Sequence, residues 1–301
     1  MAQPRLVWQS KLVLLLVLPM VAASVVLQAH WWAVNSWPVA LWATGLSLLF
    51  GLVVFQLRAA TAGAAFVGAA ITASLIFSTL TYVPFEPFPY APWHTAVVPV
   101  LAVFLLAFLA TRLGRAHKER LGTAEERRGR AAAQVAANLG FAALVSDGFA
   151  QSWLSATGWF PASPVAPNAL FAAGLASLAE AAADTVSSEV GQVLGGRPRM
   201  ITTLRAAEPG TDGAVSLAGT VAGVLAAGVV ADAGSLALGG GAPMLILAWA
   251  GGVFGFFFDS LLGATVERRG WLNNDMVNFL STASAAAFTL LLMALRARFG
   301  L

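Results

Sequence analysis

The segment Ala179-Glu180-Ala181-Ala182-Ala183-Asp184-Thr185-Val186-Ser187-Ser188-Glu189-Val190-Gly191 places three carboxyl groups in a stretch that otherwise has the composition of a membrane-spanning helix. A fourth carboxyl group, that of Asp259, lies in another apolar stretch. A charged side chain at the centre of a bilayer costs about 3 kcal/mol or more, so acids in such positions usually serve a function. We therefore expect the chemistry of the protein to centre on these side chains.

The composition of the chain is that of a membrane protein. Its 301 residues are 58% hydrophobic and only 10% charged, with a mean hydropathy of +0.78. A soluble domain carries about 25% charged residues. The sequence has no cysteine, which excludes disulfides, thiolate catalysis and cysteine-bound metals. The three histidines are scattered and form no cluster of ligands.

Long apolar runs predict an all-α integral membrane protein, a polytopic bundle of about nine transmembrane helices. Each run has about the 20 residues that are needed to cross a bilayer. The predicted spans are 12–29, 38–56, 60–81, 94–112, 131–150, 168–190, 213–232, 242–263 and 276–296.

The distribution of basic residues predicts the orientation of these spans. With the N-terminus in the cytoplasm, all of the 17 Lys and Arg residues except Arg296 and Arg298 fall on the cytoplasmic side. The net charge of +3 is then explained by topology and gives no support to nucleic-acid binding. The abundance of Ala, Gly and Arg is typical of a bacterial protein, so we expect the inner (plasma) membrane, with the site on its cytoplasmic side.

A change in composition near residue 112 predicts two regions. Residues 1–111 form an N-terminal four-helix membrane region, which we interpret as a packing or oligomerisation unit. A homo-oligomer is compatible with this interpretation, and the alternative is that these helices form part of a lipid groove. Residues 112–301 form a catalytic-like membrane domain with a polar site on the cytoplasmic side.

Helical spacing brings the acids of the second region together. At about 100° per residue, Glu180, Asp184, Ser187 and Ser188 share one face of the sixth span, whereas Glu189 points elsewhere. In the eighth span, Asp259 shares a face with the small residues Gly252, Gly255 and Gly263. Small residues allow neighbouring helices to approach closely, so we expect Asp259 to face the interior of the bundle.

Further polar residues gather at the predicted cytoplasmic ends of other spans. Arg130, Gln134 and Asn138 follow each other at intervals of four residues, and Asn274 shares a helix face with Asn278. The turn Pro209-Gly210-Thr211-Asp212-Gly213 leads into a helix N-terminus, where free N–H groups favour anions.

These residue types suit a particular class of ligand. Carboxylate oxygens suit Mg²⁺, which binds through one or two carboxylates together with substrate phosphates. Arginine side chains and backbone amides suit phosphate oxygens. The sequence therefore predicts a site for a Mg-nucleotide or Mg-diphosphate, with the apolar bundle available for a lipid tail.

Five ordered motifs also resemble a known family. They are Ala179 through Gly191, Ile201-Thr202-Thr203, Gly210 through Ser216, Asp259 through Thr265 and Asn274 through Asn278. Together with Arg130, Gln134-Val135 and Asn138, they resemble the "domain of unknown function ninety-two" family, also called transmembrane protein nineteen-like. The similarity covers about residues 112–290, with Ala214 where the family often has glycine and Asn273 where it often has aspartate.

The plant chloroplast members of this family are phytyl phosphate kinases. The resemblance therefore implies a membrane kinase that transfers a phosphoryl group from a nucleoside triphosphate to an isoprenyl or phytyl monophosphate, giving the diphosphate. CTP is the favoured donor by analogy with dolichol and phytol kinases, and ATP is the other donor considered. Because this chain has Asn273 where the family often has aspartate, the loop that contains Asn273 is less suited to bind a metal ion.

We predict the following roles on these grounds. Glu180, Asp184 and Asp259 are the expected catalytic residues and the ligands of Mg²⁺, direct or through water. The residues expected to bind substrate and nucleotide are Arg130, Gln134, Asn138, Ser187, Ser188, Glu189, Arg199, Thr202, Thr203, Arg205, Gly210, Thr211, Asp212, Gly213, Ser216, Ser260, Asn274, Asp275 and Asn278.

Three alternatives remain open from the sequence. The same residues suit a nucleotidyltransferase that releases diphosphate and forms a CDP-lipid. An ion-coupled transporter would use the acids as relays, although the polar groups gather on one side and the sequence shows no inverted repeat. A non-catalytic scaffold would leave the converging acids unexplained.

Overall fold

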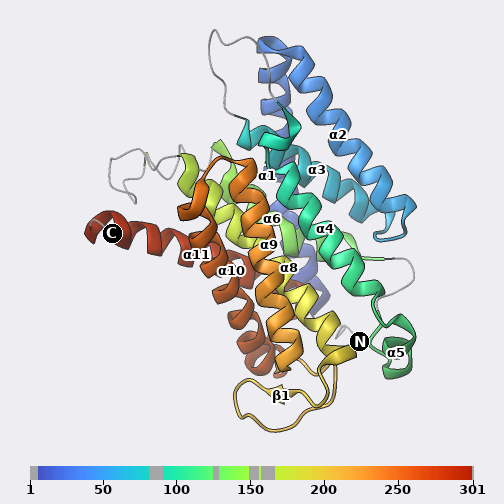
Figure 1. Ribbon diagram of the computed structural model, residues 1–301. Coiled ribbons are helices and arrows are strands. Elements are labelled where there is room, and N and C mark those ends of the chain that lie inside the picture. Colours follow the sequence, from blue (N-terminus) through green and yellow to red (C-terminus); the bar gives the residue numbers. More distant parts are fainter. Residues whose placement is uncertain (1–5, 81–90, 125–128, 149–155, 157–166, 300–301) are drawn as a thin grey trace.

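Nine helices of the bundle correspond to the nine predicted spans (Figure 1). The computed structural model describes residues 6–80, 91–124, 129–148, 156 and 167–299. Within these residues the helices are α1 (Val7–Asn35), α2 (Trp37–Gln56), α3 (Ala62–Thr79), α4 (Val97–Arg112), α6 (Ala132–Ser146), α8 (Pro167–Leu194), α9 (Leu217–Ala237), α10 (Gly241–Leu262) and α11 (Asn274–Phe299).

The prediction of an all-α integral membrane protein is confirmed, and the number of full spans is slightly lower than predicted. Seven helices in the described part of the chain are long and apolar enough to cross a membrane. An eighth span is α4 together with α5 (Arg115–Leu121), which is bent by 65° at the break between the two helices. The helix α6 has only 15 residues, and the end predicted for its span, residue 150, lies outside the described residues. The orientation with a cytoplasmic N-terminus stays a prediction.

The helix that carries the acidic segment lies at the centre of the bundle. The apolar part of α8 is 94% buried, and α4, α6, α9, α10 and α11 all pack against it. Because many residues of α8 are alanines, their small side chains let the neighbouring helices come close to its backbone. A Cβ atom added at Gly223 of α9 would lie 2.8 Å from the carbonyl oxygen of Ala183, and one added at Gly252 of α10 would lie 2.7 Å from Cβ of Ala179. The predicted close approach of small residues is therefore confirmed.

The first four helices pack directly against the rest of the molecule. Val17 of α1 contacts α6 so closely that a Cβ atom added at Gly140 would lie 2.6 Å from it. One apolar core contains buried side chains from α1, α3, α4, α6 and α8. The division of the chain at residue 112 stays a prediction about function.

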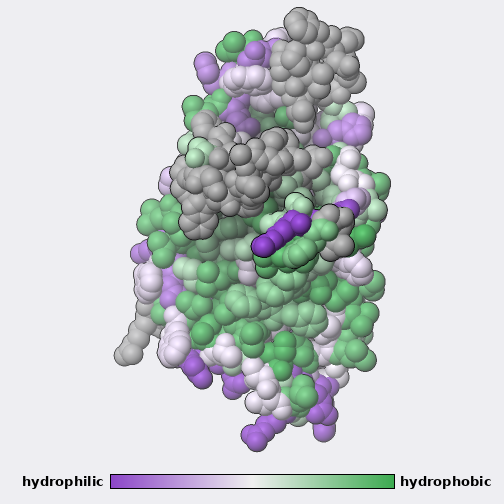
Figure 2. Space-filling model, turned by 90° about the vertical axis from the view of Figure 1, so that its left-hand side faces the viewer, coloured by the Kyte–Doolittle hydropathy of each residue, from purple (hydrophilic) through white to green (hydrophobic). Residues whose placement is uncertain are grey.

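The outer surface of the bundle suits a lipid environment. Large apolar side chains are exposed along α1, α2, α4 and α9, among them Leu15, Leu49, Leu105 and Leu225. Figure 2 shows a broad hydrophobic area over the middle of one face, with hydrophilic residues toward its upper and lower ends. The lower end holds the N-terminus and β1 (Figure 1). We call it the polar end.

Short elements close the polar end. The strands β1 (Arg199–Met200) and β2 (Ala214–Val215) pair antiparallel, with Arg199 opposite Val215. A π-helical turn, η3 (Gly263–Glu267), follows α10. The 3₁₀ turn η2 (Pro92–His94) precedes α4.

Candidate functional site

Three carboxyl groups from α8 and α10 meet inside the bundle. Glu180 is only 1% exposed. The carboxyl groups of Asp184 and Asp259 lie within hydrogen-bonding reach of each other, and Glu180 interacts electrostatically with both. The prediction that these three acids converge is thus confirmed. We call Glu180, Asp184 and Asp259 the acidic cluster.

Several oxygens of the acidic cluster lack a donor. Both carboxyl oxygens of Glu180 and Oδ1 of Asp259 are buried, and no described residue donates a hydrogen bond to them. The hydroxyl of Ser281 lies beside both acids but donates to the carbonyl of Asn278 at 3.0 Å. Buried acceptors without donors are costly, and adjacent carboxylates repel unless a cation or a shared proton lies between them.

The chemistry of this donor set fits Mg²⁺. The described residues contain no group of three or more acidic, histidine or cysteine side chains arranged as a ready-made metal cage. Mg²⁺ does not need one, because it usually keeps several waters and binds through one or two carboxylates and substrate phosphates. The unpartnered oxygens of Glu180 and Asp259 could supply such carboxylate ligands.

Arg130 is fixed next to the acidic cluster by contacts that begin in the first half of the chain. Its backbone N–H donates to Ala59 at 3.0 Å, and its carbonyl accepts from Thr61 at 3.0 Å. The preceding Gly129 has a φ of +76°, and a Cβ atom there would lie 2.3 Å from the carbonyl carbon of Ala59. The guanidinium donates to Thr185 at 3.2 Å and interacts electrostatically with Asp184. The turn between α2 and α3 therefore holds Arg130 in place.

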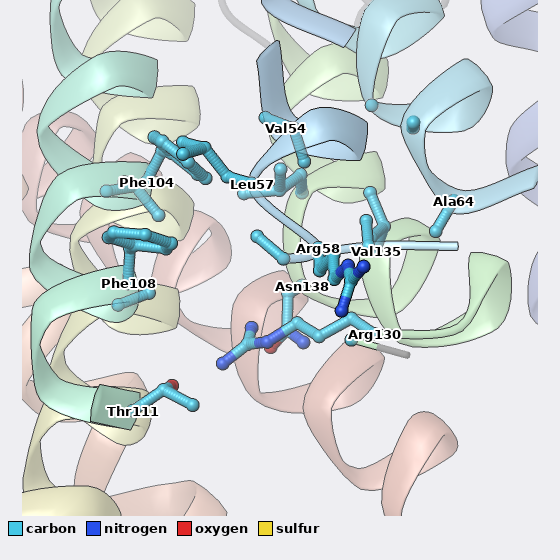
Figure 3. A pocket seen from close by; sticks show the side chains of 18 of the residues that line it. Val54, Leu57, Arg58, Ala64, Phe104, Phe108, Thr111, Arg130, Val135 and Asn138 are labelled. Carbon is cyan, nitrogen blue, oxygen red and sulfur yellow. The ribbon is translucent and has the colours of Figure 1, made fainter. Parts of the chain in front are cut away.

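A cavity of about 360 Å³ adjoins the acidic cluster and is enclosed by α2, α3, α4 and α6. Ala181 of α8, next to Glu180, forms part of its wall. Aromatic and aliphatic side chains line one part, and in Figure 3 the side chain of Arg130 reaches toward Phe108 and Thr111 of α4. Four arginines line the cavity, namely Arg58, Arg112, Arg115 and Arg130, together with one acid, Glu119.

The sequence predicts a role in the site for only one of these four arginines, Arg130. Nothing in the local sequence distinguishes Arg58, Arg112 and Arg115 from other loop arginines, whose positive charges predict the orientation of the spans. Arg58 has a φ of +54°, a left-handed conformation that is uncommon for a residue other than glycine. Such conformations persist only where the surrounding structure fixes them, and they are frequent at functional sites.

Two asparagines connect the cavity to the far side of the bundle. Asn138 of α6 lines the cavity and accepts a hydrogen bond from Asn278 of α11 at 3.3 Å. The carbonyl oxygen of the Asn278 side chain is buried, and none of the described residues donates to it. Asn138 and Asn278 are thus buried next to the cavity, whereas Asn274 is exposed at the start of α11.

Other predicted site residues form hydrogen bonds within their own helix or at its start, or pack against a neighbouring helix. The side chain of Gln134 accepts from the N–H of Ala131 at 2.6 Å at the start of α6, and Ser216 caps α9 by accepting from Gly219 at 3.1 Å. Ser260 donates back to Phe256 at 3.4 Å within α10. Ser187 packs against Gly223 of α9, and Ser188 is exposed.

Two predicted acids hold neighbouring helices. Glu189 forms a 2.6 Å ion pair with Lys118 of α5, whose side chain is only 1% exposed. Asp275 accepts a hydrogen bond from Ser10 of α1 at 2.5 Å. Asn273 caps α11 by accepting from Met276 at 2.9 Å, and its amide also donates to Ser10 at 2.9 Å. Asn273, one of the two residues at which the chain departs from the family pattern, therefore anchors α1.

The predicted phosphate-binding loop lies at the surface of the polar end. Thr202, Thr203 and Arg205 are exposed, and Arg199 donates to the carbonyl of Leu204 at 2.8 Å. Among the described residues, no contact joins Arg199 or Arg205 to the acidic cluster.

The turn that follows packs against the end of α10. Gly213 has a φ of +72°, and a Cβ atom there would lie 2.2 Å from the N atom of Ala264. Thr211 donates to Glu208 at 2.8 Å within the turn, and Gly210 packs against Thr123 beyond α5. Desolvation raises the pKa of the partly exposed Asp212 above its ordinary value, and Arg268 opposes that shift.

Two relatives of the chain are uncharacterised membrane proteins of other organisms. It is 45% identical over 108 residues to an uncharacterised membrane protein of Methanocaldococcus jannaschii, an alignment of 36% of this chain and 45% of that protein. It is 32% identical over 203 residues to an uncharacterised membrane protein of Synechocystis, covering 64% of this chain and 71% of that protein.

A third relative is the chloroplastic protein VTE6 of Arabidopsis thaliana, 29% identical over 197 residues, which are 64% of this chain and 57% of that protein. The chain thus spans less than two thirds of the length of the Methanocaldococcus and Arabidopsis relatives. No solved structure matches the chain.

Residues 45–286 match the family described as integral membrane protein DUF92. The matched region begins within α2 and contains the acidic cluster, Arg130 and most of the cavity wall. The chain belongs to the DUF92 family of integral membrane proteins.

Proposed function

We propose that the protein is a membrane phosphotransferase that moves a phosphoryl group from a nucleoside triphosphate, with CTP favoured, to an isoprenyl or phytyl monophosphate. The observation that carries this proposal is the acidic cluster, with unpartnered carboxyl oxygens, beside a cavity that is apolar in one part and lined by arginines in another. The site would lie on the cytoplasmic side of a bacterial inner membrane.

The proposed reaction needs positioning and charge neutralisation rather than covalent catalysis. An oxygen of the acceptor monophosphate attacks the γ-phosphorus of the nucleotide. The bond from that phosphorus to the oxygen it shares with the β-phosphate breaks, giving the lipid diphosphate and a nucleoside diphosphate. Because a monophosphate is already a nucleophile, the site needs no strong general base.

Different residues of the site would take different parts in this reaction. Glu180, Asp184 and Asp259 would hold Mg²⁺, which when bound offsets the negative charge of the phosphates. Arg130 lies between the acidic cluster and the cavity, so it would hold the acceptor phosphate toward the nucleotide. Asn138 and Asn278 would orient phosphate oxygens or the carboxylates.

The sequence motifs support the choice of reaction. They resemble those of a family in which the plant chloroplast members are phytyl phosphate kinases, and a chloroplastic protein is among the relatives of this chain. The motif residues Glu180, Asp184 and Asp259 are also the ones that form the acidic cluster.

The test is a transfer assay with purified protein, Mg²⁺, geranylgeranyl or phytyl monophosphate, and CTP or ATP labelled separately at the γ- and α-phosphates. We expect the γ-label in a lipid diphosphate. The α-label in the lipid would instead show nucleotidyl transfer. Label from neither position would refute both reactions and favour the ion-coupled transporter.

A further inference from the structure

We infer that the cavity between α2 and α4 is the binding site of the acceptor, with the phosphate of a single-chain lipid monophosphate against Arg58, Arg112 and Arg130. The hydrocarbon chain would lie among the apolar side chains of α2, α3 and α4. The inference rests on the proposed function for the identity of the acceptor. It gives the first four helices, which the sequence left as a packing unit or a lipid groove, a direct part in substrate binding.

The charges of the cavity favour an anion. Among the described residues that line the cavity, four are arginines and one is an acid, Glu119, which pairs with Arg115 at 3.1 Å. Arg130 also interacts electrostatically with Asp184 of the acidic cluster. The side chain of Arg58 has no partner among the described residues. Arg112 donates one hydrogen bond to the carbonyl of Leu57 at 3.2 Å, and Arg130 donates one to Thr185. A guanidinium has five N–H donors, so both retain donors for phosphate oxygens.

The rest of the cavity favours a hydrocarbon chain. Phe50 of α2 and Phe104 of α4 meet edge to face with their ring centroids 5.5 Å apart, and Phe108 lies 5.5 Å from Phe104. Small residues of α2 and α3, including Gly51 and Gly68, also line the cavity. A volume of about 360 Å³ lies within the usual range of about 300–1,000 Å³ for small-ligand sites and suits one chain better than a two-chain phospholipid.

The surroundings of the cavity provide a route from the membrane. The outer faces of α2 and α4 expose leucines such as Leu52 and Leu105. A lipid could therefore enter between these helices without leaving the hydrophobic layer. At the other end, Arg130 lies beside the acidic cluster, where the phosphoryl donor is proposed to bind, because it donates to Thr185 and interacts electrostatically with Asp184.

The test is photo-cross-linking of the full chain in lipid nanodiscs, without nucleotide. The probe is a geranylgeranyl monophosphate that carries a diazirine near the end of its chain. We expect labelled peptides from α2, α3 or α4, and competition by geranylgeranyl monophosphate but not by geranylgeraniol or inorganic phosphate.

Two arginine variants test the phosphate contact. Arg58→Gln should weaken probe binding about tenfold, the loss expected for one charged contact. Arg298→Gln removes the same charge from the far end of α11 and should leave binding unchanged. Labelling confined to other helices, or equal binding by wild type and Arg58→Gln, would overturn the inference. If Arg58→Gln fails to fold, equal competition by the alcohol and the monophosphate on wild type would overturn it.

The outcomes also separate this inference from the proposed function. Labelling of α2 to α4 without any phosphoryl transfer would keep the binding site and refute the kinase. Transfer by a protein that the probe labels elsewhere would keep the kinase and refute the binding site.

Discussion

The acidic cluster and the arginine-lined cavity lie side by side but are constructed differently. Around the acidic cluster, glycine and alanine bring backbones into contact, and Gly255 of α10 packs directly against the side chain of Glu180. Around the cavity, large side chains such as Phe104 and Arg112 span the distance between helices that pack less closely. The first arrangement fixes charged groups, which suits the chemical step, whereas the second leaves a space whose shape depends on individual side chains, which suits selection of a lipid.

Asp184→Asn should have the largest effect on turnover. The change removes a charge that the proposed reaction needs while keeping the shape of the side chain, so we expect transfer of the γ-phosphoryl group to fall at least about a thousandfold. The measurement is the labelled transfer assay, together with the thermal unfolding midpoint in detergent. Glu208→Gln, which removes an exposed carboxylate from the loop at the polar end, is the matched control and should keep full activity.

A folded and active Asp184→Asn enzyme would contradict the assignment of the acidic cluster. The acidic cluster would then have only a packing role, and the proposed division between a cluster for the chemical step and a cavity for lipid selection would no longer hold.

Lys118→Met should have the largest effect on stability. Lys118 is buried, pairs with Glu189 at 2.6 Å and donates to the carbonyls of Ala110 and Thr111 at 3.0 and 2.7 Å. Removing one partner of a buried pair leaves the other charge uncompensated, at a cost of about 3 kcal/mol. Thermal unfolding should show this loss, whereas Arg115→Gln, which breaks an exposed pair, should cost about 0.5 kcal/mol or less.

The double variant Lys118→Met/Glu189→Gln tests whether Glu189 serves stability or the reaction. The pair joins α8 to α5, which lies next to the cavity. We expect the double variant to regain part of the lost stability. If it regains stability and still loses phosphoryl transfer, the pair itself serves the reaction, which agrees with the predicted substrate role of Glu189. If it regains both, the role of Glu189 is to hold α5.

The sequence predicted the acidic cluster better than the cavity, for a physical reason. Helical periodicity is enough to place Glu180 and Asp184 on one face, and the glycine pattern around Asp259 predicts which face is buried. The cavity depends on contacts between segments far apart in the chain, such as Arg112 with Leu57 and Arg130 with Ala59. No local pattern encodes those pairings.

Some residues that the sequence predicts as phosphate-binding also have a structural role. Ser216 has the type and position of a helix N-cap, and the structure uses it as one. Asn273 occupies the corresponding cap of α11. Cap residues and anion sites occur at the same helix ends, so residue type alone does not distinguish the two roles.

Gly255→Ala tests the close packing around the acidic cluster. The added Cβ would lie 2.7 Å from both Cγ of Glu180 and Cβ of Ala285, so one or both helices must shift. Overpacking of this kind costs about 2 kcal/mol, which thermal unfolding should detect. The matched control is Gly45→Ala in α2, where an added Cβ has no neighbour within 4 Å, and we expect it to be neutral or slightly stabilising. Equal midpoints for the two variants would contradict the close packing described around the acidic cluster.

Ala107→Leu tests the shape of the cavity and should have the smallest effect. Ala107 lines the cavity on α4, so a larger side chain there would shorten the space available to a lipid chain. We expect kcat/KM for geranylgeranyl monophosphate to fall about tenfold, in keeping with about 1–3 kcal/mol for a change of this size in an apolar pocket. The shorter geranyl monophosphate should be used as well as by wild type. Leu109→Phe adds bulk to the lipid-facing side of the same helix and should change neither value. An equal loss for both chain lengths would show that the variant disturbs the chemical step, and the cavity would then lose its separate role in selecting the lipid.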